Sequence, residues 1–321
     1  MAGCGVTPAT ARFLRRIRSK AATMEPSMSR AYLAGLTALR DQMSTRAFET
    51  LIATTPLDMI AGLAFSDANL NAAFVRYREQ VQLTTEGGAR FFARDIPGVA
   101  TAERRGIVVA FDRLSPAVID AMRALDTRVM TRLATDTRET VRAILENGLR
   151  DGANPRATSV AIREMIGLGP TQVQEARNFK AALEAGNLGK VQTYAARNRA
   201  VDGLIARGNL TPERIAKATE DYIKRRVAIN AAATARTATL ESFRHGQRLS
   251  WQDAIDKGIV DGGRLMRRWV TVMDGREREE HGAMNGEVTG FDEPYSNGDM
   301  VIGEGSPWNC RCSDYVYIGR D

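Results

Sequence analysis

The sequence predicts a mainly α-helical protein, with a body of long helices and a small α+β module at its C-terminal end. Apolar residues recur at helical spacing through most of the first 246 positions. Beyond Gly246 the pattern changes, because all three tryptophans lie there together with much of the Gly, Asn and Asp turn chemistry. Residues 314–318 then alternate in the way that indicates a strand. A helical body followed by a mixed module accounts for this order of patterns.

Three segments are expected along the chain. Residues 1–54 form a basic N-terminal arm and first helix, residues 55–246 form the α-helical body, and residues 247–321 form the C-terminal α+β module. No repeat of fixed period is visible, so a solenoid is not expected.

The first segment is expected to contain two helices. Residues 13–18 mix apolar and basic side chains, which predicts a short amphipathic helix, while a disordered basic end fits the composition equally well. Residues 29–54 keep helical spacing. The next helix is expected to have Thr55 as its N-cap and Pro56 at its first helical position.

This next helix is expected to run on through Val81, with Gly87 and Gly88 as a break or kink. Residues 96–98, Ile-Pro-Gly, indicate a turn. The apolar run at 107–111 predicts either a short strand or a buried helical segment, because periodicity alone does not separate the two.

Helix boundaries are clearer in the second half of the body. Ser115 before Pro116 and Asn154 before Pro155 are typical helix starts, since the polar side chain caps the first turn. Glycines are expected at the helix ends. The helices expected here span residues 115–147, 154–167, 170–185, 191–207 and 211–246.

The composition excludes several classes of protein. With 44% hydrophobic and 26% charged residues, the chain is expected to fold rather than remain disordered. No apolar run approaches the ~18 residues of a membrane span, so we expect no membrane-spanning helix. The basic N-terminus lacks the apolar region of a secretory signal. Cys4 is isolated from the other two cysteines, so we do not expect a framework of disulfide bonds. We expect the protein to be in a reducing compartment.

The net charge of +7 is unevenly distributed along the chain. Residues 1–20 carry +5, residues 21–268 carry +9, and residues 269–321 carry −7. The basic parts are therefore candidates for contact with a partner or with DNA, and a solvated helical surface is the alternative interpretation. The candidate contact residues of the arm are Arg12, Arg15, Arg16, Arg18 and Lys20.

The stretch from Trp269 to Cys312 carries the most specific pattern. Residues 269–272 are aromatic and β-branched, which predicts a strand. Asp274 followed by Glu277 is an Asp variant of the capping box, so a helix is expected to begin at Gly275. On that helix His281 is expected to share a face with Arg278, and Asp274 is expected within reach of Arg278.

Two thiols follow at positions 310 and 312. On an extended segment Cys310 and Cys312 point to the same side and Arg311 points to the other, so both thiols are expected to converge with His281. Two interpretations stay open: a structural zinc site with one further ligand or water, and a packed, hydrogen-bonded core cluster.

These residues resemble the C-terminal signature of the Mu F-like phage head morphogenesis proteins, which are minor head proteins of tailed bacteriophages and prophages. The elements of the resemblance are Trp269, Asp274, Arg278, His281, Phe291, Asn309, Cys310, Arg311 and Cys312. Weaker similarity lies in residues 167–183 and 226–238, where Ala238 replaces the usual Glu. The resemblance covers about residues 140–321.

The resemblance implies a structural protein that acts in capsid assembly near the portal and is packaged in the head. It implies the portal protein, scaffold or major capsid protein as partners, and packaged DNA as a further one. The expected location is the capsid interior or portal vertex, after assembly in the host cytoplasm. The signature residues are then expected to fix loop geometry in the C-terminal module.

No enzyme is expected, because neither a nucleophile–base set nor paired carboxylates are visible. Trp269, Phe291 and Trp308 are expected in the core rather than stacked on bases. The alternative is a particle-delivered zinc-dependent hydrolase or toxin-like effector. The chain ends nine residues after Cys312, so no appended effector domain is expected. A host DNA-associated helical protein is a third hypothesis.

Overall fold

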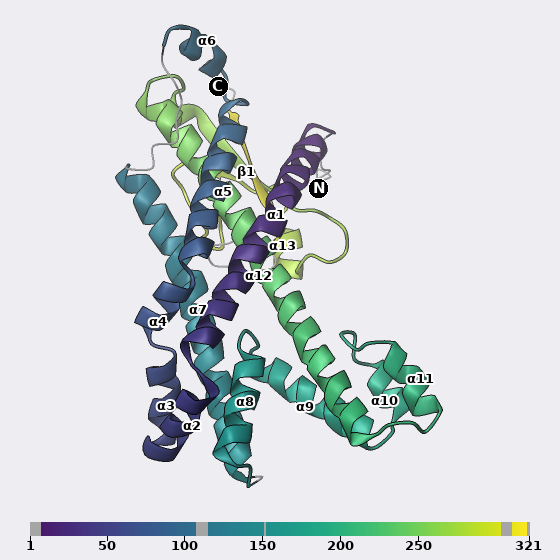
Figure 1. Cartoon of the computed structure of the whole chain (residues 1–321). Helices are drawn as coiled ribbons and strands as arrows, with labels where there is room; N and C mark the ends of the chain where they lie inside the picture. Colours follow the sequence, from purple (N-terminus) through teal and green to yellow (C-terminus); the bar gives the residue numbers. More distant parts are fainter. Residues whose placement is uncertain (1–7, 107–114, 151, 303–309, 320–321) are drawn as a thin grey trace. The chain divides into compact units, whose positions relative to one another are not determined.

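A computed structural model describes residues 8–106, 115–150, 152–302 and 310–319 (Figure 1). Within these ranges the chain is mainly α-helical and carries a three-stranded antiparallel sheet near its C-terminus, so the predicted fold class is confirmed. The features that lie outside the described residues are Cys4, the segment 107–111, Trp308 and Asn309.

The chain divides into two compact units that interleave along the sequence. The first unit comprises Met1–Ala31, Tyr77–Thr127 and Ala233–Asp321, and the second comprises Tyr32–Arg76 and Arg128–Ala232. The helices Pro8–Gln42, Val75–Ala93, Pro116–Arg150 and Pro212–Asp256 therefore contribute residues to both units. The division of the sequence into three successive segments stays a prediction.

The N-terminal helices differ from the expected ones in their boundaries. They are α1 (Pro8–Gln42), α2 (Thr45–Thr54), α3 (Leu57–Ala64), α4 (Asp67–Ala73) and α5 (Val75–Ala93). The expected separate helix at 13–18 is wrong, because these residues belong to α1. Pro56 is the N-cap of α3, one position later than predicted. The long helix expected after Thr55 is three helices, since Ser66 caps α4 by accepting a hydrogen bond from the Asn69 amide.

Gly87 and Gly88 do not break α5, which runs continuously from Val75 to Ala93, so the predicted break is wrong. A Cβ atom at Gly88 would lie 2.8 Å from the carbonyl oxygen of Phe243 in α12 (Pro212–Asp256). A Cβ atom at Gly246 would lie 2.3 Å from the carbonyl oxygen of Thr85. The two glycines therefore allow the backbones of α5 and α12 to approach closely within the first unit. Gly246 therefore lies inside α12, which continues to Asp256, ten residues beyond its expected end.

The next elements follow the predicted caps. Gly98, with φ +85°, precedes α6 (Val99–Arg104), in agreement with the expected turn. Ser115 accepts a hydrogen bond from the Val118 amide at the start of α7 (Pro116–Arg150). Asn154 caps α8 (Pro155–Met165) through a 2.8 Å hydrogen bond from the Ala157 amide. These starts are confirmed, because cap chemistry is local.

The segment after α9 (Pro170–Glu184) is not the single helix that was expected. It forms α10 (Leu188–Gln192) and α11 (Ala200–Ala206). Between them, Arg197 donates hydrogen bonds to the carbonyl oxygen of Gln192 and the carboxylate of Asp202. These bonds stabilise the turn between the two helices.

Aromatic packing joins the helices of the second unit. Phe179 of α9 stacks on Tyr222 of α12 with ring centroids 4.4 Å apart, and Tyr194 meets both rings edge-on. Although α12 has 45 residues, no helix in the described ranges has an apolar stretch sufficient to span a membrane.

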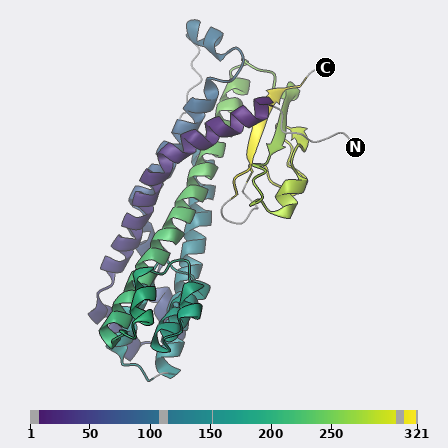
Figure 2. The same cartoon turned by 90° about the vertical axis from the view of Figure 1, so that its right-hand side faces the viewer.

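The C-terminal part of the first unit holds the sheet, whose strands lie side by side in Figure 2. Its elements are β1 (Leu265–Val270), α13 (Glu279–Ala283), β2 (Val288–Gly290) and β3 (Ser313–Ile318), with strand order β2-β1-β3. Both neighbours pair antiparallel with β1, in a register that sets Trp269 opposite Asp314. The predicted strands at 269–272 and 314–318 are confirmed, although β1 begins and ends earlier than expected.

Alternate residues of β1 are buried, as a one-sided strand requires. Leu265, Arg267 and Trp269 form this buried set. The guanidinium of Arg267 donates to the carbonyl oxygens of Gly290, Met300 and Glu293, which ties the loop after β2 to the sheet.

Candidate metal centre and basic pocket

His281, Cys310 and Cys312 converge, as the sequence predicts. His281 lies on α13, and the two cysteines lie on the extended segment that enters β3. The His281 Nδ1 atom lies 3.7 Å from the Cys310 Sγ atom and 3.6 Å from the Cys312 Sγ atom. All three side chains are buried, and their ligand atoms lie within 4.8 Å of one another. These residues are the candidate ligands of a metal ion.

A buried arginine holds the segment that carries the thiols. Arg244 of α12 donates hydrogen bonds to the carbonyl oxygens of Ile302 (2.9 Å), Cys310 (2.9 Å) and Cys312 (2.6 Å). The Arg244 residue is only 3% exposed, so these bonds are shielded from water. Arg244 therefore fixes the backbone of both cysteines.

The histidine is held from the other side. The hydroxyl of Thr271 donates to the carbonyl oxygen of His281 at 3.0 Å, and the Thr271 amide donates to the side-chain oxygen of Asn285. The Trp269 ring meets the His281 ring edge-on, with centroids 5.5 Å apart. Contacts of the end of β1 with α13 thus orient the imidazole.

The two thiols strongly influence each other's ionisation. A hydrogen bond from the Cys312 thiol lowers the pKa of Cys310, and the positive charge of Arg244 acts in the same direction. The same hydrogen bond, followed by burial, raises the pKa of Cys312. The lowered pKa favours the thiolate form of Cys310, and the thiolate is the form of cysteine that binds metals.

Arg311 lies on the other side of the segment, where it binds Asp274. The Nη1 and Nη2 atoms of Arg311 both donate to the carboxylate, Nη2 at 2.8 Å. A hydrogen bond from Arg311 lowers the pKa of Asp274 to about 2. The sequence suggested Arg278 as the neighbour of Asp274 on one helix, but Arg278 is the N-cap of α13.

The helix expected to begin at Gly275 is wrong, because α13 begins at Glu279. One of the two bonds of the predicted capping box is nevertheless present: the Asp274 amide donates to the carboxylate of Glu277 at 3.1 Å. Gly275 has φ +74°, a left-handed conformation that ends any continuous helical turn there. The bond therefore closes a loop rather than starting a helix.

Sequence reasoning did not identify Arg244, Thr271 or Arg267 as parts of the site. The available sequence signal is the middle of α12, where the polar residues Ser242, Arg244 and Gln247 lie on a helix that lacks an apolar stripe. The structure shows that all three are buried. The sequence-predicted core residues Trp269 and Phe291 are buried, whereas Asn309 lies outside the described residues.

A cavity of about 190 Å³ adjoins the candidate metal centre. The three candidate ligands contribute to its wall. Three arginines and one glutamate also line it: Arg276, Arg278, Arg311 and Glu277. The cavity has room for water or a small anion beside the thiols.

A second cavity of the first unit, of about 550 Å³, is strongly basic. We call it the basic pocket, and its charged lining consists of Arg15, Arg18, Glu25, Arg236, Arg276 and Arg311. Glu25 pairs with Arg236 at 2.7 Å, and Arg311 binds Asp274. In the part of the chain that the structure describes, Arg15, Arg18 and Arg276 form no ion pair. The basic pocket therefore has cationic charge available for an anionic partner.

The other basic residues of the N-terminal arm do not line this pocket. Arg16 pairs with Asp95 at 3.1 Å and lies over the Phe91 ring. Arg12 and Lys20 lie on the same helix but contribute nothing to the pocket wall. Of the predicted contact residues, only Arg15 and Arg18 line the basic pocket within the described part of the chain.

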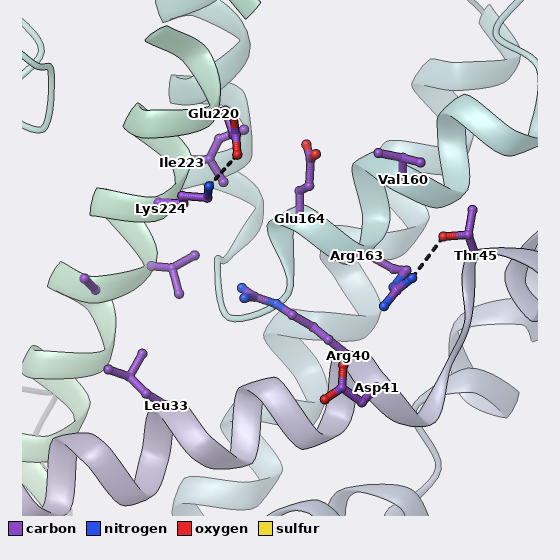
Figure 3. Close-up of a pocket in the computed structure, with 12 residues that line it drawn as sticks. Leu33, Arg40, Asp41, Thr45, Val160, Arg163, Glu164, Glu220, Ile223 and Lys224 are labelled. Carbon is purple, nitrogen blue, oxygen red and sulfur yellow. Dashed lines mark hydrogen bonds and ion pairs between the residues drawn. The ribbon is translucent and has the colours of Figure 1, made fainter. Parts of the chain in front are cut away.

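The second unit has a cavity of about 490 Å³ with mixed charge (Figure 3). Arg40 extends into it from α1, and its guanidinium donates to the carbonyl oxygen of Ile166. Arg163 donates to the Thr45 hydroxyl at 2.9 Å, and Glu220 pairs with Lys224. Burial raises the pKa of Glu164. Because both cationic and anionic groups line this cavity, it is a weaker candidate for an anion site than the basic pocket.

Comparison with known protein families gives one match. The sequence model described as Phage Mu protein F like protein matches residues 139–314. Searches of curated proteins and of solved structures found no match. The matched region includes the helices α8 to α13, the strands β1 and β2 and the first two residues of β3. It also includes all three candidate metal ligands. The chain therefore belongs to the Phage Mu protein F like family.

Proposed function

We propose that this chain is a structural minor head protein of a tailed bacteriophage or prophage, acting in capsid assembly near the portal and packaged in the head. The family match over residues 139–314 carries the proposal, since this family points to head morphogenesis. The portal protein, scaffold or major capsid protein is the proposed partner class.

The construction of the C-terminal module supports a structural role rather than a catalytic one. Arg244 and Arg267, which are both buried, bind main-chain carbonyl oxygens of the loops around the sheet. Such bonds hold a loop in one conformation, because a broken bond leaves a buried carbonyl unsatisfied. A fixed surface of this kind suits docking within an assembly.

The basic pocket supports contact with packaged DNA. Arg15, Arg18 and Arg276 line this pocket without carboxylate partners among the described residues. Guanidinium groups bind phosphate in planar, bidentate geometry. We propose the pocket as the place where the phosphate backbone binds.

Deletion of the gene in the producing phage or prophage tests the proposed function. The expected result is a loss of infectious titre, together with aberrant or empty heads in electron micrographs, both restored by the wild-type gene in trans. A deletion strain with normal heads and normal titre would contradict the proposal. The control is deletion of a gene of the same phage that is not needed for assembly.

A further inference from the structure

We propose that His281, Cys310 and Cys312 bind one zinc ion through the Nδ1 atom and the two Sγ atoms. The site would stabilise the C-terminal module, and it goes beyond the proposed role in the head. The argument rests on the geometry of the three ligand atoms, on their burial and on the bonds that hold the two segments.

The separations of the ligand atoms fit tetrahedral zinc. Bonds of ~2.3 Å to sulfur and ~2.05 Å to nitrogen, at the tetrahedral angle, place a nitrogen and a sulfur ligand about 3.6 Å apart. The observed distances from the His281 Nδ1 atom are 3.7 Å to Cys310 Sγ and 3.6 Å to Cys312 Sγ. Both nitrogen–sulfur separations therefore match those of ligands on a single zinc ion, and all three ligand atoms lie within 4.8 Å of one another.

A metal-free cluster accounts less well for this arrangement. The Nδ1 atom has one lone pair in the plane of the ring, so it accepts one good hydrogen bond. Two sulfur atoms nevertheless lie at almost equal distances from it. A zinc ion uses the lone pairs of all three atoms at once, and the thiol protons leave to solvent as it binds.

The protein holds the ligands in place through bonds outside the cluster. Arg244 fixes the carbonyl groups of Cys310 and Cys312, and Thr271 fixes the carbonyl group of His281. Such supporting bonds are typical of metal sites, where they set the direction of each ligand. Because both segments are held independently, the ligand atoms stay together without the ion, and binding requires little rearrangement.

The donor set indicates which metal binds. Two thiolates and one imidazole favour zinc over magnesium or calcium, which prefer oxygen ligands. The described residues supply three ligands, and the adjoining cavity of about 190 Å³ has room for a water molecule as the fourth. Two thiolates also balance the charge of the ion, which lowers the cost of burying it.

Metal analysis of the full-length chain tests the proposal. The protein is purified under reducing conditions without a histidine tag, incubated with zinc, and freed of excess metal. We expect about one zinc per chain, and at least tenfold less in the Cys310→Ser and Cys312→Ser variants. The matched control is Cys4→Ser, which removes the remaining thiol and is expected to retain the zinc. Wild-type protein without bound zinc, or equal loss in all three variants, would overturn the proposal.

Cobalt substitution keeps the test decisive if a serine variant fails to fold. Wild-type protein loaded with Co²⁺ is expected to show intense visible bands of a tetrahedral site and a near-ultraviolet band from thiolate ligands. Folded protein with Co²⁺ that gives neither band would overturn the proposal. In the His281→Asn variant the thiolate band is expected to remain while the visible bands shift, and an unchanged spectrum would exclude the histidine as a ligand.

Discussion

Asp274 and Arg311 form a bidentate ion pair that joins the loop before α13 to the segment before β3. The two residues are 37 positions apart, and Arg311 stands between the two cysteines of the candidate metal centre. Side chains alternate along an extended segment, so Arg311 points to the side opposite the two thiols. When its guanidinium binds Asp274, both thiols therefore face His281. The ion pair and the candidate metal centre therefore depend on the same short segment.

Replacement of Asp274 by Asn is expected to remove a pH-dependent part of the stability. The folded-state pKa of Asp274 is lowered to about 2 from an ordinary 3.8, so ionised Asp274 stabilises the fold above pH 3.8. This contribution is lost as pH falls through 3.8 toward 2. The measurement is the free energy of unfolding of both proteins from pH 2 to 6. The difference between them should shrink as pH falls, and a constant difference would contradict the assigned pairing.

Replacement of Arg244 by Met is expected to destabilise the first unit by about 3 kcal/mol, because three buried carbonyl oxygens lose their donor. The control is Arg236→Met, which removes a half-exposed pair with Glu25 and should cost less than about 1 kcal/mol. Denaturant unfolding measures both values. Equal effects of the two substitutions would show that Arg244 does not hold the segment.

Replacement of Gly246 by Ala is expected to cost about 3 kcal/mol, because the added Cβ would lie 2.3 Å from the Thr85 carbonyl oxygen. Gly62 on α3 is the matched control, since nothing lies within 4 Å of a Cβ atom there. Gly62→Ala should stabilise the chain by about 0.5–1 kcal/mol through helix propensity. Thermal unfolding distinguishes the two, and a stabilising Gly246→Ala would disprove the close contact of α5 and α12.

Replacement of both Arg15 and Arg18 by Gln is expected to weaken binding of double-stranded DNA about tenfold, with a reduction of about 2 in the slope of log affinity against log salt. The matched control, Arg12→Gln with Lys20→Gln, removes the same charge from the same helix outside the basic pocket. Fluorescence anisotropy at several salt concentrations measures both. Identical losses in the two variants would indicate general electrostatic attraction rather than a defined pocket.

Local chemistry accounts for what the sequence predicted well. Ser115 and Asn154 cap their helices as expected, since a cap involves only residues of the next turn. The convergence of His281 with Cys310 and Cys312 was predictable for a related reason, because the alternation of a strand places both thiols on one side.

Tertiary contacts account for what the sequence could not predict. Gly246 has the appearance of a helix end, but its lack of a side chain serves the contact with α5, a helix about 150 positions earlier. Arg244 has no recognisable motif, because its role depends on carbonyl groups some 60 residues later. The sequence suggested Arg278 as the partner of Asp274, because Arg278 is only four positions away. The observed partner, Arg311, lies 37 positions away in the sequence and is brought close by the fold.

The most direct test of the proposed role is quantitative mass spectrometry of density-purified particles, compared with the soluble lysate of the same induced culture. We expect this chain to co-sediment with the portal and major capsid proteins, at far fewer copies than the major capsid protein. Particles that contain portal and capsid proteins but lack this chain would contradict the claim that it is packaged in the head.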